Sequence, residues 1–209
     1  MIKNKLYFFV LVILFVFGNQ GSVPVKNKIP KEKIAKAITI IIQPYSDISE
    51  KYITHVKNEL TKIYPNIILN KAIPLPKRAY YIKRNRYRAD TLINILRQTT
   101  QTGCVTIGMT TKDISDSKGN IPDYGIMGLG YQPGSSCVVS TFRLNKENLL
   151  EQFFKLSIHE LGHTQGLPHC PVKTCFMRDA EGKNHTNEEK EFCPKCKAHL
   201  ISKGWIFKD

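Results

Sequence analysis

The stretch 159–175, HELGHTQGLPHCPVKTC, holds three histidines, one glutamate and two cysteines, all side chains that can serve a metal ion. His159 and His163 are four residues apart, so on a helix both imidazoles lie on one face and can point at one ion. Gly166 is suited to end that helix, after which the chain can turn back and bring in His169. Three neutral nitrogen ligands leave the fourth position of a zinc ion open for water, which is typical of a catalytic site.

Glu160 adjoins the first of these ligands and is the candidate general acid/base. Zinc lowers the pKa of a bound water to about 7, and a carboxylate facing that water can take its proton and later pass it to a leaving amine. The pattern therefore predicts zinc-dependent hydrolysis of peptide bonds. Histidines that serve helix packing are the alternative explanation, but they do not account for Gly166 and His169 at these offsets.

A second cluster is made of cysteines in two close pairs: Cys170, Cys175, Cys193 and Cys196. The spacing is C-x4-C, seventeen residues, then C-x2-C, which resembles a four-cysteine zinc ribbon or knuckle. Four thiolates complete the tetrahedron around a zinc ion and leave no open position, so such a site is structural. The sequence thus predicts two zinc ions, one catalytic and one structural.

The combined pattern resembles the archaemetzincin family of zinc metallopeptidases. The resemblance rests on H-E-x-x-H-x-x-G-x-x-H-C-x4-C-x-M between His159 and Met177, followed by Cys193-x-x-Cys196. It implies that the three histidines hold the catalytic zinc, that Glu160 is the general acid/base and that the four cysteines hold the structural zinc. It also implies that Met177 is the Met-turn residue beneath the catalytic metal.

Cys104 and Cys137 lie outside both clusters. In the sheet that the resemblance implies, the third and fifth strands are parallel neighbours, and each of these cysteines lies at or near the start of one of them. A disulfide between the two is therefore a hypothesis. Two buried free thiols are the alternative.

Periodicity predicts the elements that must position these groups. Beta-branched runs favour strands, and apolar residues at intervals of three and four favour amphipathic helices. The order is strand, helix, strand, helix, three strands, helix and a cysteine-rich tail, a mixed α/β (α+β) domain. The resemblance implies a metzincin-like mixed twisted sheet, an active-site helix and a small zinc-braced C-terminal subdomain. The expected strands are 37–45, 66–76, 104–114, 125–132 and 135–144, and the expected helices are 47–64, 87–99 and 145–166, with Asn145 as the N-cap of the last.

The N-terminal segment 1–22 has two lysines followed by an unbroken apolar run of twelve residues, Leu6 to Phe17. This layout predicts a secretory signal peptide, with an uncleaved membrane anchor as the alternative. A linker over 23–36 and a peptidase domain over 37–209 are expected to follow. The chain is then expected to be exported, periplasmic or secreted, or else anchored in a membrane. Cysteines in an oxidising compartment can pair as disulfides, but metal bound during folding would protect the four thiolates.

The net charge of +14 could suit nucleic acid, but the basic residues are spread along the chain and form no dense stripe. We expect a basic solvated surface, no nucleic acid partner, a peptide or protein substrate, and a monomer that meets a membrane only if the N-terminal segment stays uncleaved. Two other functions remain open at this stage: a catalytically silent archaemetzincin relative, and a basic zinc-ribbon binding module. Two zinc ions per chain would favour the peptidase, and one would favour the module.

Overall fold

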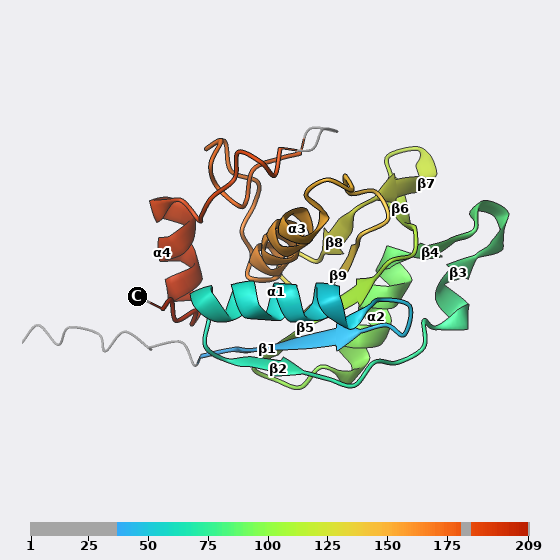
Figure 1. Ribbon diagram of the computed structural model, residues 1–209, viewed down its shortest axis with the longest axis horizontal. Coiled ribbons are helices and arrows are strands. Elements are labelled where there is room, and N and C mark those ends of the chain that lie inside the picture. The colour runs from blue at the N-terminus through green and yellow to red at the C-terminus, as the bar shows by residue number, and fades with distance from the viewer. Residues whose placement is uncertain (1–36, 181–184, 209) are drawn as a thin grey trace, which may run out of the picture. The chain divides into compact units, whose positions relative to one another are not determined.

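A five-stranded sheet forms the centre of the domain, in the order β2-β1-β5-β9-β8 (Figure 1). The computed structural model describes residues 37–180 and 185–208. Four strands run parallel, β1 (Thr39–Pro44), β2 (Ile67–Leu69), β5 (Cys104–Thr110) and β9 (Ser136–Ser140), and the edge strand β8 (Gly128–Gly130) is antiparallel to β9. The predicted mixed α/β fold is confirmed, although β2 is much shorter than the strand expected over 66–76.

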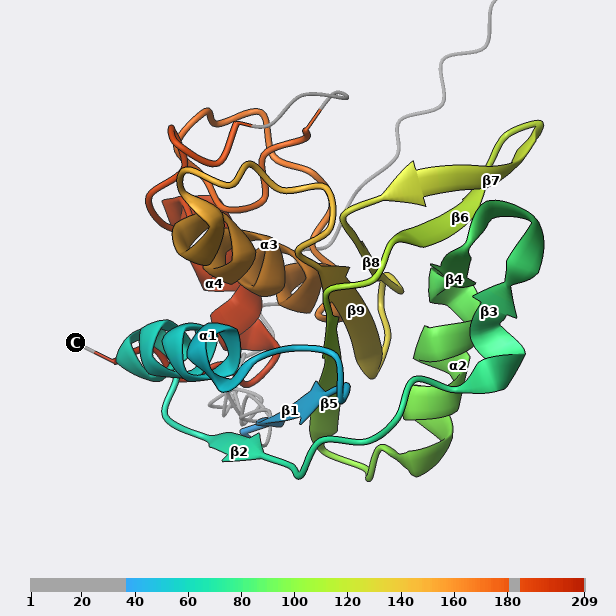
Figure 2. The same ribbon diagram turned by 45° about the vertical axis from the view of Figure 1, so that its right-hand side comes forward.

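The two faces of this sheet are covered by different helices (Figure 2). Helices α1 (Glu50–Ile63) and α3 (Leu149–Thr164) lie on one face, and α2 (Ala89–Thr99) lies on the other. Neighbouring residues of β9 show the alternation, because Val139 packs into the core with α1 and α3 while Val138 packs with α2. The amphipathic periodicity of the sequence thus gave correct positions for all three helices.

A second, four-stranded sheet was not expected as a separate unit. Its order is β3-β4-β6-β7, with β3 (Tyr80–Tyr81), β4 (Arg86–Arg88), β6 (Ile114–Lys118) and β7 (Ile121–Ile126). Two short 3-10 helices, η1 (Lys77–Ala79) and η2 (Ile82–Arg84), flank β3. The β6–β7 hairpin leads directly into β8, so the second sheet is joined to the edge of the first (Figure 2).

The C-terminal tail forms a helix, α4 (Pro194–Ser202), that the sequence-based assignment missed. Beyond it, Trp205 is buried and stacks near Tyr64 at the end of α1, with 4.9 Å between ring centroids. Phe192 and Phe207 also lie within about 6 Å of the Trp205 ring. This aromatic group fixes the cysteine-bearing tail to the main core.

The structure contradicts the hypothesis of a disulfide between Cys104 and Cys137. Strands β5 and β9 are parallel neighbours as expected, but their register pairs Cys137 with Ile107, three residues beyond Cys104. An offset of three along a strand amounts to roughly 10 Å and places the side chain on the opposite face. Both cysteines are free thiols, Cys137 buried and Cys104 partly exposed.

The predictions for 1–22 and 23–36 lie outside the described residues. Among the residues that are described, no helix combines the length and the apolar character that a membrane crossing requires.

Candidate active site

Helix α3 carries the HELGH motif in its last two turns. Gly166 follows the helix with a φ of +86°, a left-handed conformation that ends the helix and suits glycine. At the other end the expected N-cap is wrong by three residues, since Asn148 occupies that position. Asn145 instead exchanges hydrogen bonds with the side chain of Gln152, which ties the preceding loop to the first turns of the helix.

The chain turns back after Gly166 and brings His169 beside the two helical histidines, as the sequence predicted. Ring centroids lie 4.6 Å apart for His159 and His163, 5.4 Å for His159 and His169, and 4.9 Å for His163 and His169. One ring nitrogen of each lies within 4.8 Å of the others. We call these three residues the histidine cluster; its geometry fits one shared metal ion.

Each Nδ1 atom of the histidine cluster is engaged elsewhere. His159 Nδ1 lies 2.7 Å from the carbonyl oxygen of Phe176, and His163 Nδ1 lies 2.8 Å from that of Leu167. His169 Nδ1 lies 3.2 Å from Oδ2 of Asp179. These acceptors hold the proton on Nδ1 and leave Nε2 of each ring as the ligand atom.

Burial keeps the two helical imidazoles neutral. The pKa of His159 falls to about 3, mainly because the ring is buried and also because His163 lies beside it. Burial also lowers the pKa of His163. Neutral imidazoles at pH 7 are the form that binds zinc, so no proton has to be removed from these two ligands.

Glu160 lies on the same helix with its carboxyl group buried, 6% exposed, against the edge strand. Burial raises the pKa of this carboxyl to about 8, and a dication bound beside it would lower the pKa again. Gly128 of β8 makes room for it, since a Cβ at that position would come within 2.6 Å of Oε1 of Glu160. The candidate acid/base is therefore held between the helix and β8.

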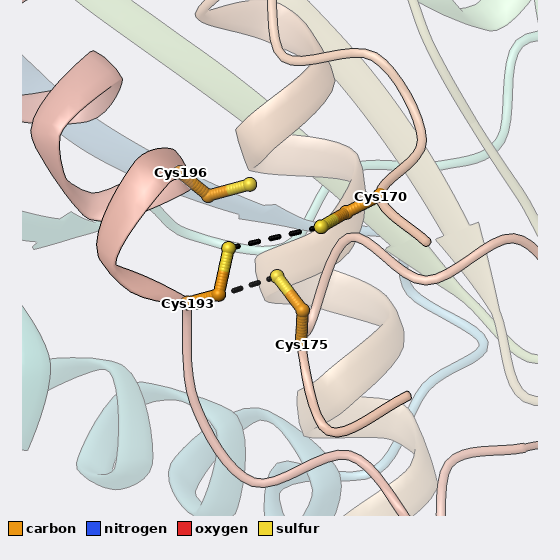
Figure 3. Close-up of side chains that lie close together, drawn as sticks. All are labelled: Cys170, Cys175, Cys193 and Cys196. Carbon is orange, nitrogen blue, oxygen red and sulfur yellow. Dashed lines mark hydrogen bonds between the residues drawn. The ribbon is translucent and has the colours of Figure 1, made fainter. Parts of the chain in front are cut away.

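The four cysteines also converge, as Figure 3 shows. Their sulfur atoms lie within 4.8 Å of one another and all four residues are buried. Cys193 and Cys196 come from the start of α4, and Cys170 and Cys175 from the segment after α3. We call these four residues the cysteine cluster. Its four sulfurs can fill a tetrahedral coordination shell.

The segment between the two clusters is folded tightly. The N–H of Cys170 donates to the carbonyl of Met177 at 2.7 Å, and the N–H of Arg178 donates to the carbonyl of Cys175 at 3.0 Å, which closes a turn around Met177. Met177 is fully buried and its sulfur faces Gly162 of α3, where a Cβ would come within 2.3 Å of it. The turn thus packs Met177 against α3 at Gly162; its role as a Met-turn residue stays a prediction.

A cavity of about 770 Å³ opens over the histidine cluster. One wall is the run from Tyr124 to Gly130 in β7 and β8, and the opposite side is α3 with Lys155, Leu156, His159 and Glu160. Within the described residues β8 pairs only with β9, so its outer edge carries backbone groups that can still bind. The cavity can admit an extended peptide across the histidines.

Sequence reasoning missed Asp179, which adds a carboxylate behind His169. Its signal was weak, a lone aspartate ten residues after the ligand that it contacts. It also missed the backbone carbonyls that orient the other two rings, because these depend on how the turn packs rather than on residue type.

Comparison with known proteins places this geometry in context. The model described as Peptidase family M54 matches residues 30–202. The archaemetzincin of Methanopyrus kandleri is 31% identical over 155 residues, which cover 72% of this chain and 85% of that protein. The archaemetzincin of Haloarcula marismortui is 27% identical over 174 residues, which cover 77% of this chain and 98% of that protein.

Solved archaemetzincin structures are also similar to this chain. The crystal structure of archaemetzincin from Archaeoglobus fulgidus complexed with malonate matches with a TM-score of 0.67 at 27% identity, covering 78% of this chain and 99% of that one. The archaemetzincin structure from Methanopyrus kandleri matches with a TM-score of 0.66 at 25% identity, covering 80% and 95%.

The comparison contradicts the predicted signal peptide over 1–22. The family match begins at residue 30, and the match to the Haloarcula marismortui protein covers 98% of that protein but 77% of this chain. Two lysines before an apolar run form a pattern of composition alone, and composition does not distinguish a cleaved signal from other apolar N-terminal segments. The compartment predicted from the same segment is untested.

Proposed function

Because this chain belongs to peptidase family M54 and is a zinc metallopeptidase, we propose that the histidine cluster holds its catalytic zinc and that Glu160 is its general acid/base. The observation that carries this proposal is the convergence of three ring nitrogens within 4.8 Å, with every Nδ1 engaged by an acceptor. Substrates are peptides or proteins.

The donor set fits zinc. Three neutral imidazoles facing an open cavity are the ligand set of catalytic zinc sites, and Asp179 behind His169 is the usual partner of a ligating histidine. Zinc bound there supplies the Lewis acidity that activates water and polarises the scissile carbonyl.

The protein's own residues perform the remaining steps. Glu160 takes a proton from the attacking water at a carboxylate oxygen and delivers it to the leaving amine. Its burial against Gly128 holds the carboxyl where it faces the peptide and shields it from bulk solvent. The outer edge of β8 can pair with the substrate backbone and align the scissile bond over the cluster.

For the cysteine cluster we propose a second, structural zinc. Burial raises the pKa of the Cys175 and Cys196 thiols, so without a cation both stay protonated at neutral pH. A dication that binds all four sulfurs displaces those protons and joins the 170–178 segment to α4. No position remains for water or substrate, so this ion would brace the fold.

A digest of a peptide library by the zinc-loaded chain, read by mass spectrometry, tests the catalytic assignment. Glu160→Gln should keep its zinc and lose hydrolysis by about a hundredfold to ten-thousandfold. Equal cutting by wild type and variant would refute the role of Glu160. Failure of the wild type to cut any peptide would favour the catalytically silent relative. The zinc-ribbon binding module gains no support, because it leaves the histidine cluster unexplained.

A further inference from the structure

One end of the active cavity is lined by cations that the proposed mechanism does not use. Arg143, from the loop between β9 and α3, and Lys118, at the end of β6, both line the cavity that contains Glu160. Lys118 Nζ lies 4.6 Å from the centre of the Tyr124 ring, on the same wall.

Arg143 is held rigidly by Asp113. Its Nε and one terminal nitrogen donate to the two carboxylate oxygens at 2.8 and 2.9 Å, a bidentate pair. A guanidinium has five N–H groups, so three remain. Among the described residues no acceptor takes a hydrogen bond from those three, and 34% of the side chain is exposed where it lines the cavity.

Asp113 also contacts a second arginine, Arg86. Arg86 Nε lies 3.1 Å from Asp113, and Arg86 also lies 3.3 Å from Asp123. The side chain of Asp113 is 7% exposed, and its carboxylate contacts both guanidinium groups. The arrangement fixes the position of Arg143, whose three remaining N–H groups stay available toward the cavity.

Gly125 provides the space that Arg143 occupies. A Cβ at Gly125 would come within 2.1 Å of a terminal nitrogen of Arg143 and within 2.3 Å of its Cζ. The guanidinium therefore lies flat against the backbone of β7, on the wall that continues into β8. A peptide paired with β8 would extend past it.

The acidic side chains that line the cavity lie against groups other than Arg143. Asp179 contacts His169, and Glu160 lies against Gly128. Glu189 is buried, and Lys155 and Arg178 are the cations that lower its pKa. None of these carboxylates contacts Arg143.

We propose that Arg143 is a specificity-determining residue that binds a carboxylate of the peptide substrate, either an Asp or Glu side chain or the C-terminal carboxylate. This rests on the proposed peptidase function. Three N–H groups that are fixed in place before binding match a carboxylate and lose little freedom when they bind it.

The test uses the zinc-loaded full chain and a peptide from the library digest in matched forms: Glu or Asp against Gln or Asn, and a free C-terminus against an amide. We expect wild type to prefer the acidic form by about tenfold or more in kcat/KM. Arg143→Ala should bring that preference close to one. If wild type discriminates only between the free and the amidated C-terminus, the ligand is the terminal carboxylate. If it discriminates only between the acidic and the neutral side chain, the ligand is that side chain.

Two further variants separate recognition from folding. Arg143→Lys keeps the charge but loses the bidentate hold, and Gly125→Ala displaces the guanidinium without removing it, so both should lower the preference. Arg97→Ala, an exposed arginine on α2, should leave the preference unchanged. Melting temperatures check that each variant is folded.

Binding of the same peptides to zinc-loaded Glu160→Gln, measured by calorimetry, needs no turnover and separates this proposal from the peptidase mechanism. The acidic form should bind about tenfold tighter than the neutral form, and Arg143→Ala in that background should abolish the difference. Equal binding of acidic and neutral peptides by Glu160→Gln, or a preference that survives Arg143→Ala, would overturn the proposal even if hydrolysis proceeds as expected.

Discussion

His169 and Cys170 are consecutive residues whose side chains belong to clusters of opposite character. The side chain of His169 is 47% exposed and faces a cavity, whereas Cys170 is 8% exposed and faces three other buried sulfurs. The histidine cluster offers three ligand atoms and the cysteine cluster offers four. Ligand number and exposure together separate a site that can bind substrate from one that can only hold the chain.

Removing the cysteine cluster should have the largest effect on stability. Cys193→Ser with Cys196→Ser leaves two sulfurs, too few to close a tetrahedral site, and should lower the free energy of unfolding by about 5 kcal/mol or more. Chemical denaturation and zinc analysis measure the loss of stability and of one ion. Cys104→Ser, a free thiol outside both clusters, is the matched control. Stability equal to wild type in the double variant would remove the structural role.

Removing a histidine ligand should instead abolish activity and spare the fold. His163→Ala should lose the other zinc and lower the rate of peptide hydrolysis by at least about a hundredfold, with a melting temperature near that of wild type from which only this zinc has been removed. His55→Ala, on α1 and outside the cluster, should retain both the zinc and the activity. Unfolding of His163→Ala would mean that the histidine cluster also has a structural role.

Asp179 is not a member of the histidine cluster but contacts His169. Asp179→Asn should weaken zinc binding at the histidine cluster by about tenfold to a hundredfold, because it removes the carboxylate charge that lies 3.2 Å from Nδ1 of His169. Competition with a chelator measures the affinity. Glu188→Gln, a nearby exposed carboxylate paired with Arg178, should leave it unchanged. If Asp179→Asn and Glu188→Gln bind zinc with the same affinity, Asp179 does not support zinc binding through His169.

The smallest effect concerns Glu189, which lines the cavity but belongs to neither cluster. Burial raises its pKa to about 7, while Lys155 and Arg178 lower it and Glu188 raises it. A carboxyl whose pKa is higher in the folded state favours folding at low pH, and that contribution is lost as the pH rises through about 7.

Glu189→Gln removes this titration. The variant should be more stable than wild type by about 1 kcal/mol at pH 8, and the difference should shrink as the pH falls toward the ordinary value of 4.5. Thermal denaturation across this pH range measures it. If the difference in stability between Glu189→Gln and wild type is the same at every pH, Glu189 is not buried as a neutral acid.

Both clusters could be predicted from sequence because their ligands are local. His159 and His163 sit one helical turn apart, and each cysteine pair spans a few residues. Helix α4 also had a signal, since Pro194 occupies its first turn, where proline is favoured.

Features that depend on long-range packing could not be predicted. The predicted disulfide failed because the register of β5 and β9 places Cys104 and Cys137 on opposite faces, and no local pattern sets that register. The second sheet escaped detection because β4 is the charged tripeptide RYR, held by Arg86 and Arg88 ion pairs to distant aspartates rather than by an apolar pattern.

Stepwise removal of metal from the zinc-loaded wild-type chain tests the division between the two clusters most directly. A chelator titration would be followed at once by zinc release, peptide hydrolysis and circular dichroism. We expect two ions per chain, the first leaving with the activity while the fold persists, and the second leaving only as the domain unfolds. A single ion per chain, or two ions that leave together with activity and fold, would contradict a catalytic histidine cluster beside a structural cysteine cluster.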